Sequence, residues 1–235
     1  MISGTDIQAK NGVKIQSTLR LWQLISPALP VGAYAYSQGL ESAVERGWVD
    51  NEQSVYDWLC GVMNHSLASL DVPVAIRLYR AHKNGDDAAI VYWNQYLLAS
   101  RETAELRLED AQLGKALARV LGGLGVEKPC TWDCTHNIAY LSMFSLAAVY
   151  WGINENDMLM GFLWAWSENQ VSAAIKLVPL GQTSGQGILS KLMTDIPQVL
   201  AQGAGCRDDQ ISNSVPGLAI ASAGHETQYS RLFRS

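Results

Sequence analysis

The chain has 235 residues, of which 48% are hydrophobic, and a formal net charge of −5 at pH 7, so it can bury a sizeable core and we expect a single domain. Lysine and arginine are scattered without a basic cluster, which excludes the continuous positive stripe of a nucleic acid binding protein. The first twenty residues lack the apolar run of a secretory signal, and the cysteines form no compact disulfide framework, so we expect a cytoplasmic protein.

The N-terminal part of the chain predicts two helices around a break. Residues 1–18 are polar and are expected to form a flexible leader, and a short helix should follow over 19–25. The segment Leu24–Glu41 then places two prolines and two glycines among apolar and aromatic residues, which predicts a break inside the core. A second helix should begin near Tyr34 and end near Gly47. Its expected buried face comprises Tyr36, Leu40, Ala43, Val44 and Trp48.

The rest of the chain keeps a helical period. Polar residues predict helix starts at Asn51, Asp71 and Asp86. Further helices are expected over 102–121, 135–151, 156–178, 188–200 and 208–223, with the glycine-rich loop 122–132 between two halves. The uncharged run 135–154 is too short and too polar for a membrane span, and a buried helix is expected there. No window alternates with period two, so we predict an all-α, single-domain bundle of about ten helices with mobile N- and C-terminal segments.

Ser37 lies in a short motif that suggests catalysis. Ala35–Gly39 has the small-x-Ser-x-Gly order of the nucleophile elbow of α/β-hydrolases. That elbow requires a strand before the serine, and Pro30 to Ala33 make a poor strand. A helical serine hydrolase that uses Ser37 and a histidine is therefore kept only as an alternative function.

Two other motifs suggest ligands. Cys130, Cys134 and His136 are the compact set of metal-ligand residues in the chain, but a fourth ligand is missing nearby, so we expect no metal site and keep a nickel carrier as an alternative. Gly181–Gly187 precedes a helix, as phosphate loops do, but it lacks their Gly-Lys pair. We expect no cofactor.

The C-terminal residues have the composition of a binding segment. Large apolar side chains alternate with arginines close to the chain end, and aromatic residues and arginine dominate binding hot spots. A tail folded back on its own domain is the alternative. The predicted partner-binding residues are Tyr229, Ser230, Arg231, Leu232, Phe233 and Arg234.

Three segments together resemble the UreF family of urease accessory proteins. They are Ser26–Glu41 (SPALPVGAYAYSQGLE), Ile175–Gln186 (IKLVPLGQTSGQ) and His225–Ser235 (HETQYSRLFRS). The resemblance implies a UreF-like all-α domain over 19–223 and a partner-binding tail over 224–235. The residues that carry the motifs are Pro27, Pro30, Gly32, Tyr36, Ser37, Gly39, Glu41, Lys176, Gly181, Gln182, Gly185 and Gln186.

The same resemblance implies a function and a set of partners. A member of this family is expected to be no enzyme but a chaperone of urease maturation. It would bridge a UreD-type (also called UreH-type) accessory protein and the UreG-type GTPase while nickel is inserted into apo-urease, and it would form a homodimer. Nucleic acid and membrane are not expected as partners.

Overall fold

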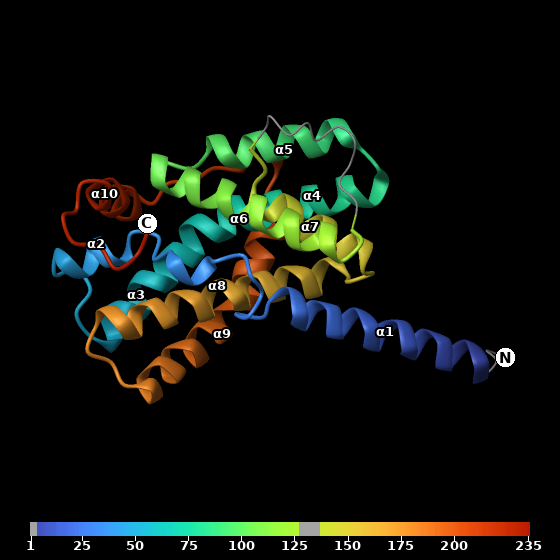
Figure 1. The fold of residues 1–235 in the computed structure, drawn as a ribbon, viewed down its shortest axis with the longest axis horizontal. Coiled ribbons are helices and arrows are strands. Elements are labelled where there is room, and N and C mark those ends of the chain that lie inside the picture. Colours follow the sequence, from blue (N-terminus) through green and yellow to red (C-terminus); the bar gives the residue numbers. More distant parts are fainter. Residues whose placement is uncertain (1–3, 127–136) are drawn as a thin grey trace.

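A computed structural model describes residues 4–126 and 137–235 (Figure 1). These residues contain no β-strand, and the predicted all-α bundle is confirmed. Three short elements are the 3₁₀ turns η1 (Ala33–Ala35) and η3 (Asp208–Gln210) and the π-helical segment η2 (Met63–Asp71). The α-helices are α1 (Gly4–Leu24), α2 (Leu40–Glu45), α3 (Glu52–Val62), α4 (Val72–Asn84), α5 (Asp87–Ala99), α6 (Ala104–Gly123), α7 (Tyr140–Tyr150), α8 (Glu155–Leu177), α9 (Gln182–Ala204) and α10 (Pro216–His225).

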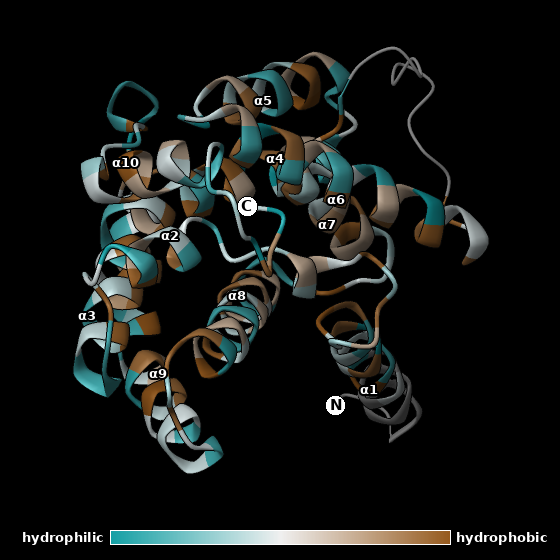
Figure 2. Ribbon diagram, turned by 60° about the vertical axis from the view of Figure 1, so that its left-hand side comes forward, coloured by the Kyte–Doolittle hydropathy of each residue, from teal (hydrophilic) through white to brown (hydrophobic). Residues whose placement is uncertain are grey.

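The core lies where α4, α7, α8 and α9 pack against one another. α8 runs through the middle of the bundle, and the C-terminus lies beside α2 and α10 (Figure 1). Hydrophobic and hydrophilic residues are mixed along the helices in Figure 2, as expected for helices that bury one side. Large side chains that are completely buried include Phe144, Leu40, Leu78, Leu97 and Leu117.

The first helix differs from its prediction. α1 begins at Gly4, well before the expected start at Leu19, and it extends away from the body (Figure 1). No proline interrupts the chain before Pro27, so the helix can continue through the predicted leader. Its last turns are anchored, with Leu24 buried and Leu21 against Gly161 of α8. The flexibility of residues 1–18 stays a prediction.

The second helix is shorter than predicted. Residues 33–35 form only the 3₁₀ turn η1, and α2 begins at Leu40. Gln38 and Gly39 both have positive φ, at 54° and 78°, which no α-helix can contain. The expected start near Tyr34 is therefore wrong. Trp48 was expected on the buried face and is 44% exposed, because α2 ends at Glu45 before reaching it.

The third and fourth predicted helices are one continuous helical run, Glu52–Asn84. The Asn51 side chain caps its start as predicted, but Asp71 has ordinary helical dihedrals and caps nothing. The π-helical segment η2 precedes Pro73 within this run. The run is long and apolar enough to span a membrane, yet 72% of its most apolar window is buried, as in the core helix of a bundle.

The later helices follow their predictions with two exceptions. Caps are present at Asp86 before α5, Thr103 before α6 and Asn154 before α8. One exception is the segment 181–187, which was expected to precede a helix over 188–200 and instead forms the first turns of α9. The other is the helix predicted over 208–223: residues 208–210 form the 3₁₀ turn η3, and α10 begins only at Pro216, which is in its first turn. Most of the predicted boundary loop, 122–132, lies outside the described residues.

Candidate functional site

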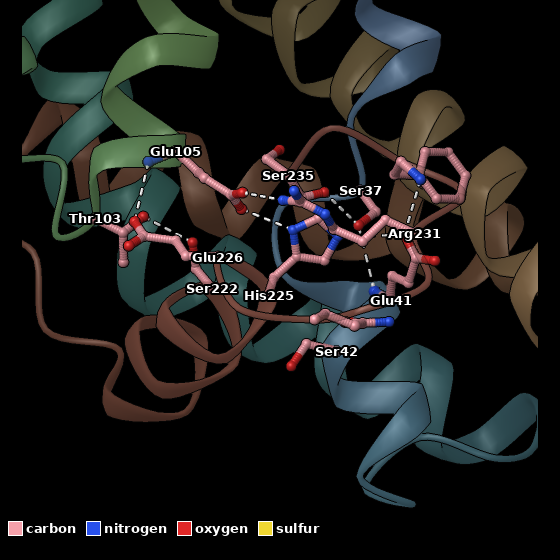
Figure 3. A network of polar contacts seen from close by, with 12 residues as sticks. Ser37, Glu41, Ser42, Thr103, Glu105, Ser222, His225, Glu226, Arg231 and Ser235 are labelled. Atoms are coloured by element: carbon pink, nitrogen blue, oxygen red, sulfur yellow. Dashed lines mark hydrogen bonds and ion pairs between the residues drawn. The ribbon is translucent and has the colours of Figure 1, made fainter.

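The C-terminal tail (residues 224–235) docks against the segment that contains the first motif (Figure 3). The backbone N–H groups of Leu232 and Phe233 donate to the two oxygens of the Glu41 carboxylate, at 2.6 and 2.8 Å. The N–H of Arg234 donates to the Ala35 carbonyl at 2.8 Å. Glu41 is 7% exposed and lies in the first turn of α2, so its carboxylate presents a fixed acceptor to the tail backbone.

Ionisable side chains from several helices contact one another at the start of the tail. The two ring nitrogens of His225, which is completely buried, lie 2.7 Å from Glu105 and 3.3 Å from Glu41. Glu105 also accepts a hydrogen bond from Arg231 at 2.7 Å. The Glu226 carboxylate caps the start of α6 by accepting from the backbone N–H groups of Ala104 and Glu105. Helices α2, α6 and α10 are thereby joined through one polar network (Figure 3).

The last residue of the tail, Ser235, forms a hydrogen bond with a second acidic side chain, Glu109. Ser235 Oγ donates to Glu109 Oε2 at 2.7 Å, and the Gln38 side-chain amide donates to Glu109 Oε1 at 2.8 Å. Trp166 Nε1 in turn donates to Gln38 Oε1 at 2.8 Å, which fixes the orientation of that amide. Burial raises the pKa of Glu109 to about 7.

Ser37 holds the tail and is not placed as a nucleophile. Its hydroxyl donates to the Ser235 carbonyl oxygen at 2.6 Å, and its own N–H donates to the same oxygen at 2.8 Å. The Ser37 side chain is completely buried. His225, the histidine of this network, has both ring nitrogens on carboxylates, so it cannot act as the base for Ser37 without rearrangement. Ser37 also follows a 3₁₀ turn where a nucleophile elbow has a strand.

The second motif reaches the tail through Lys176. The Lys176 ammonium lies 5.6 Å from the centre of the Phe233 ring, a cation–π distance. The other residues of this motif serve the connection from α8 to α9. A Cβ at Gly185 would overlap Ile175, so glycine permits the close packing of the two helices, whereas Gly181, Gln182 and Gln186 are exposed.

The remaining residues of the first motif shape the break before α2. Gly32, with φ of 85°, and Gly39 supply the left-handed conformations, and Pro27 and Pro30 are exposed. Tyr36 is buried and donates to Gln112 of α6 at 2.6 Å. The break therefore turns Ser37 and Glu41 toward the tail.

The tail alternates between inward and outward side chains. Phe233 and Ser235 are buried, and Arg231 pairs with Glu105. Tyr229 and Leu232 are 103% and 64% exposed, and Ser230 and Arg234 are also exposed. Backbone and side-chain hydrogen bonds along residues 231–235 hold the tail against α2 and α6, as in the alternative of a tail folded back on its own domain, and the mobility of the tail stays a prediction. Phe233 belongs to the core, so it is not available as an outward contact.

A cavity of about 120 Å³ lies beside the two residues that bind Ser235 or support that contact, Glu109 and Gln38. Gln38, Glu109 and Trp166 line it, and so does Arg101. The Arg101 guanidinium binds Asp71 at 2.7 Å and Asp110 at 2.9 Å, and these two carboxylates raise its pKa. The ion triad of Asp71, Arg101 and Asp110 joins η2 to α6, so it has a structural role in the wall of the cavity.

Sequence reasoning missed several residues of the site. No pattern singled out Glu105, Glu109, Gln38 or Trp166, and His225 was noted only as the first residue of a motif. A weak signal exists for Glu105 and Glu109, which are one turn apart on α6 and thus share a face. Cys130, Cys134 and His136 lie outside the described residues, and the described residues contain no group of three side chains that could hold a metal.

Comparisons with known proteins agree on one family. The UreF family model matches residues 49–193. A urease accessory protein UreF from Alkalilimnicola ehrlichii is 49% identical over 92% of this chain and 95% of its own length. Proteins of the same name from Chromohalobacter salexigens and Teredinibacter turnerae are 47% and 48% identical over 92% of this chain, and 93% and 98% of their lengths.

Proposed function

The chain belongs to the UreF family of urease accessory proteins, and from this membership we propose that it is a non-enzymatic assembly factor for nickel insertion into urease. It bridges a UreD/UreH-type accessory protein and the UreG-type GTPase, and it reaches apo-urease through that complex. It acts in the cytoplasm as a homodimer. Nickel is the cargo of this pathway and not a resident cofactor of the chain.

The observation that supports this proposal is the outward face of the docked tail. Tyr229 and Leu232 are exposed apolar side chains beside the exposed Arg234, and the tail backbone behind them is anchored by Glu41 and Ser37. A segment that is already ordered loses little conformational entropy on binding. Aromatic residues and arginine on such a segment are typical of a binding hot spot.

The absence of an enzymatic role is proposed from the site chemistry. Ser37 is buried with its hydroxyl directed at a carbonyl oxygen of the tail. Glu41 accepts two backbone N–H groups and faces His225, so neither oxygen is open to a substrate. Ser37 and Glu41, the candidate reactive side chains of this site, are thus used to hold the tail.

Reconstitution from purified proteins tests the bridging role. The full chain is mixed with a tagged UreD/UreH-type protein and the UreG-type GTPase, and complexes are separated by size-exclusion chromatography with light scattering. We expect the GTPase to co-elute with the tagged protein only when the chain is present, and the chain alone to hydrolyse neither esters nor GTP. Equal capture of the GTPase without the chain would contradict the bridge.

A further inference from the structure

The cavity beside Glu109 has the size and the apolar walls of a small-molecule site. Its volume is about 120 Å³, and an engineered protein cavity of about 150 Å³ holds a benzene molecule. Leu106, Phe162 and Trp166 line it, and all three side chains are buried. A small organic molecule with an apolar part therefore fits this space.

Three polar side chains on the wall of this cavity make no hydrogen bond within the part of the chain that the structure describes. Ser66 of η2 is 3% exposed, yet its hydroxyl has no partner. The Oδ1 atom of Asn213 is buried without a donor. The Tyr140 hydroxyl is also unpaired, and burial raises the pKa of Tyr140. Buried polar groups normally have a partner, so these oxygens favour a ligand that carries several N–H donors.

The wall of the cavity also carries more negative than positive charge. The Arg101 guanidinium is shared between the Asp71 and Asp110 carboxylates, so this triad remains negative. Glu109 is 5% exposed, and both of its oxygens accept hydrogen bonds, as expected of an ionised carboxylate. The two donors, a hydroxyl and an amide, are neutral. Because buried charges are normally paired with opposite charges, these carboxylates favour a cation in the cavity.

We propose that this cavity binds a small alkylguanidinium ion. A guanidinium group has several N–H donors in one plane, which suits the Glu109 carboxylate together with the unpaired oxygens of Ser66 and Asn213. Its weak hydration suits apolar walls, and the rings of Phe162 and Trp166 attract a cation. A hydrated metal ion fits less well, because apolar walls do not replace its water ligands. The inference concerns the isolated chain and does not depend on the proposed bridging role.

Titration of methylguanidinium into the isotope-labelled full chain, followed by NMR, tests this site. The signal is the indole N–H of Trp166, which lines the cavity and donates to Gln38. Measurement at about pH 8 keeps Glu109 mostly ionised, since burial raises its pKa to about 7. N-Methylurea is the control ligand, because it has nearly the same shape without the charge.

The two ligands are expected to differ in affinity. We predict saturable binding of methylguanidinium with a Kd below about 1 mM, and binding of N-methylurea at least about tenfold weaker. Absence of saturable binding of methylguanidinium would overturn the proposal. Equal affinity for the two ligands would also overturn it, because the cavity would then hold a neutral polar molecule without preference for a cation.

A charge substitution locates the bound cation. Glu109→Gln keeps the size of the side chain and removes its charge, so the Kd of methylguanidinium is expected to rise at least about tenfold. Glu45→Gln removes a carboxylate at an exposed position on α2 and should leave the Kd unchanged. Unchanged affinity in folded Glu109→Gln would contradict the proposed site.

A pair of serine substitutions decides the matter if Glu109→Gln does not fold, as judged by circular dichroism. Ser66→Ala removes an unpaired hydroxyl from the cavity wall, and the Kd should rise at least about threefold. Ser145→Ala is the matched control, because Ser145 on α7 is also completely buried with an unpaired hydroxyl but does not line the cavity. Equal Kd values in the two variants would show that methylguanidinium binds elsewhere, and the proposal would fail.

Discussion

Glu41 shows how a single side chain can organise a site. Its carboxylate accepts from two consecutive backbone N–H groups of the tail and faces His225. A charged acceptor satisfies both N–H groups at once, and its loss would leave buried donors without partners. The position of the tail therefore depends on this residue as well as on the buried Phe233 ring.

Replacement of Glu41 tests that role. Glu41→Ala is expected to lower the free energy of unfolding by about 1.5 to 3 kcal/mol, the usual range for hydrogen bonds to a charged group. Glu41→Gln should lose less, because one oxygen acceptor remains. Urea denaturation gives both values.

The matched control is Glu45→Ala, one turn further along α2 at an exposed position. Its effect is expected to stay within about 0.5 kcal/mol, as for most surface changes. Equal losses in Glu41→Ala and Glu45→Ala would show that the tail contacts contribute nothing measurable.

Local signals explain which parts of this site the sequence could predict. Helix caps at Asn51 and Asp86 depend on side chains bonding to nearby N–H groups, so they can be recognised in a short window. The partner of Glu41 at Leu232 is 191 positions away, and no local pattern links the two. The tail was identified as special by its composition, but its anchoring required the fold.

At the scale of elements, the break before α2 places the first motif against α10. Gly39 has φ of 78° and lies close to the backbone of Ser222 in α10. The sequence predicted a break from its prolines and glycines, but it could not indicate that two left-handed residues, Gln38 and Gly39, delay the helix to Leu40. Tertiary packing against α10 decides this detail.

Two glycine substitutions separate backbone strain from packing. Gly32→Ala and Gly39→Ala both place a side chain at positive φ, which costs about 1 to 2 kcal/mol. A Cβ at Gly32 meets open space, whereas one at Gly39 would lie 3.1 Å from the Ser222 nitrogen. We therefore expect Gly39→Ala to destabilise the chain by about 1 kcal/mol or more beyond Gly32→Ala.

Thermal and urea unfolding of the two variants provide this comparison. Gly32→Ala serves as the control for the left-handed conformation alone. Similar losses in both variants would mean that the close approach of α2 and α10 relaxes without cost.

At the scale of the whole molecule, the fold brings the three sequence motifs into contact at the C-terminal tail. The tail contacts α2 through Glu41 and α6 through Glu105 and Glu109, and the Lys176 ammonium at the end of α8 lies 5.6 Å from the centre of the Phe233 ring. The all-α class and most helices could be predicted, because the helical spacing of apolar residues and the capping side chains can be recognised within short stretches of sequence. The meeting of the three motifs was not predicted, because it arises from long-range packing.

We propose that the anchored tail presents Tyr229 and Leu232 to a UreD/UreH-type partner. It is tested most directly by isothermal titration of that partner into the double variant Tyr229→Ala with Leu232→Ala. Both side chains are exposed, so melting temperature and circular dichroism should not change. Tyr92→Ala on α5, also exposed at 55%, is the control for loss of a surface aromatic. We predict that the partner binds the double variant at least about tenfold more weakly and the control variant with unchanged affinity. Unchanged affinity in the double variant would show that Tyr229 and Leu232 do not contact the partner.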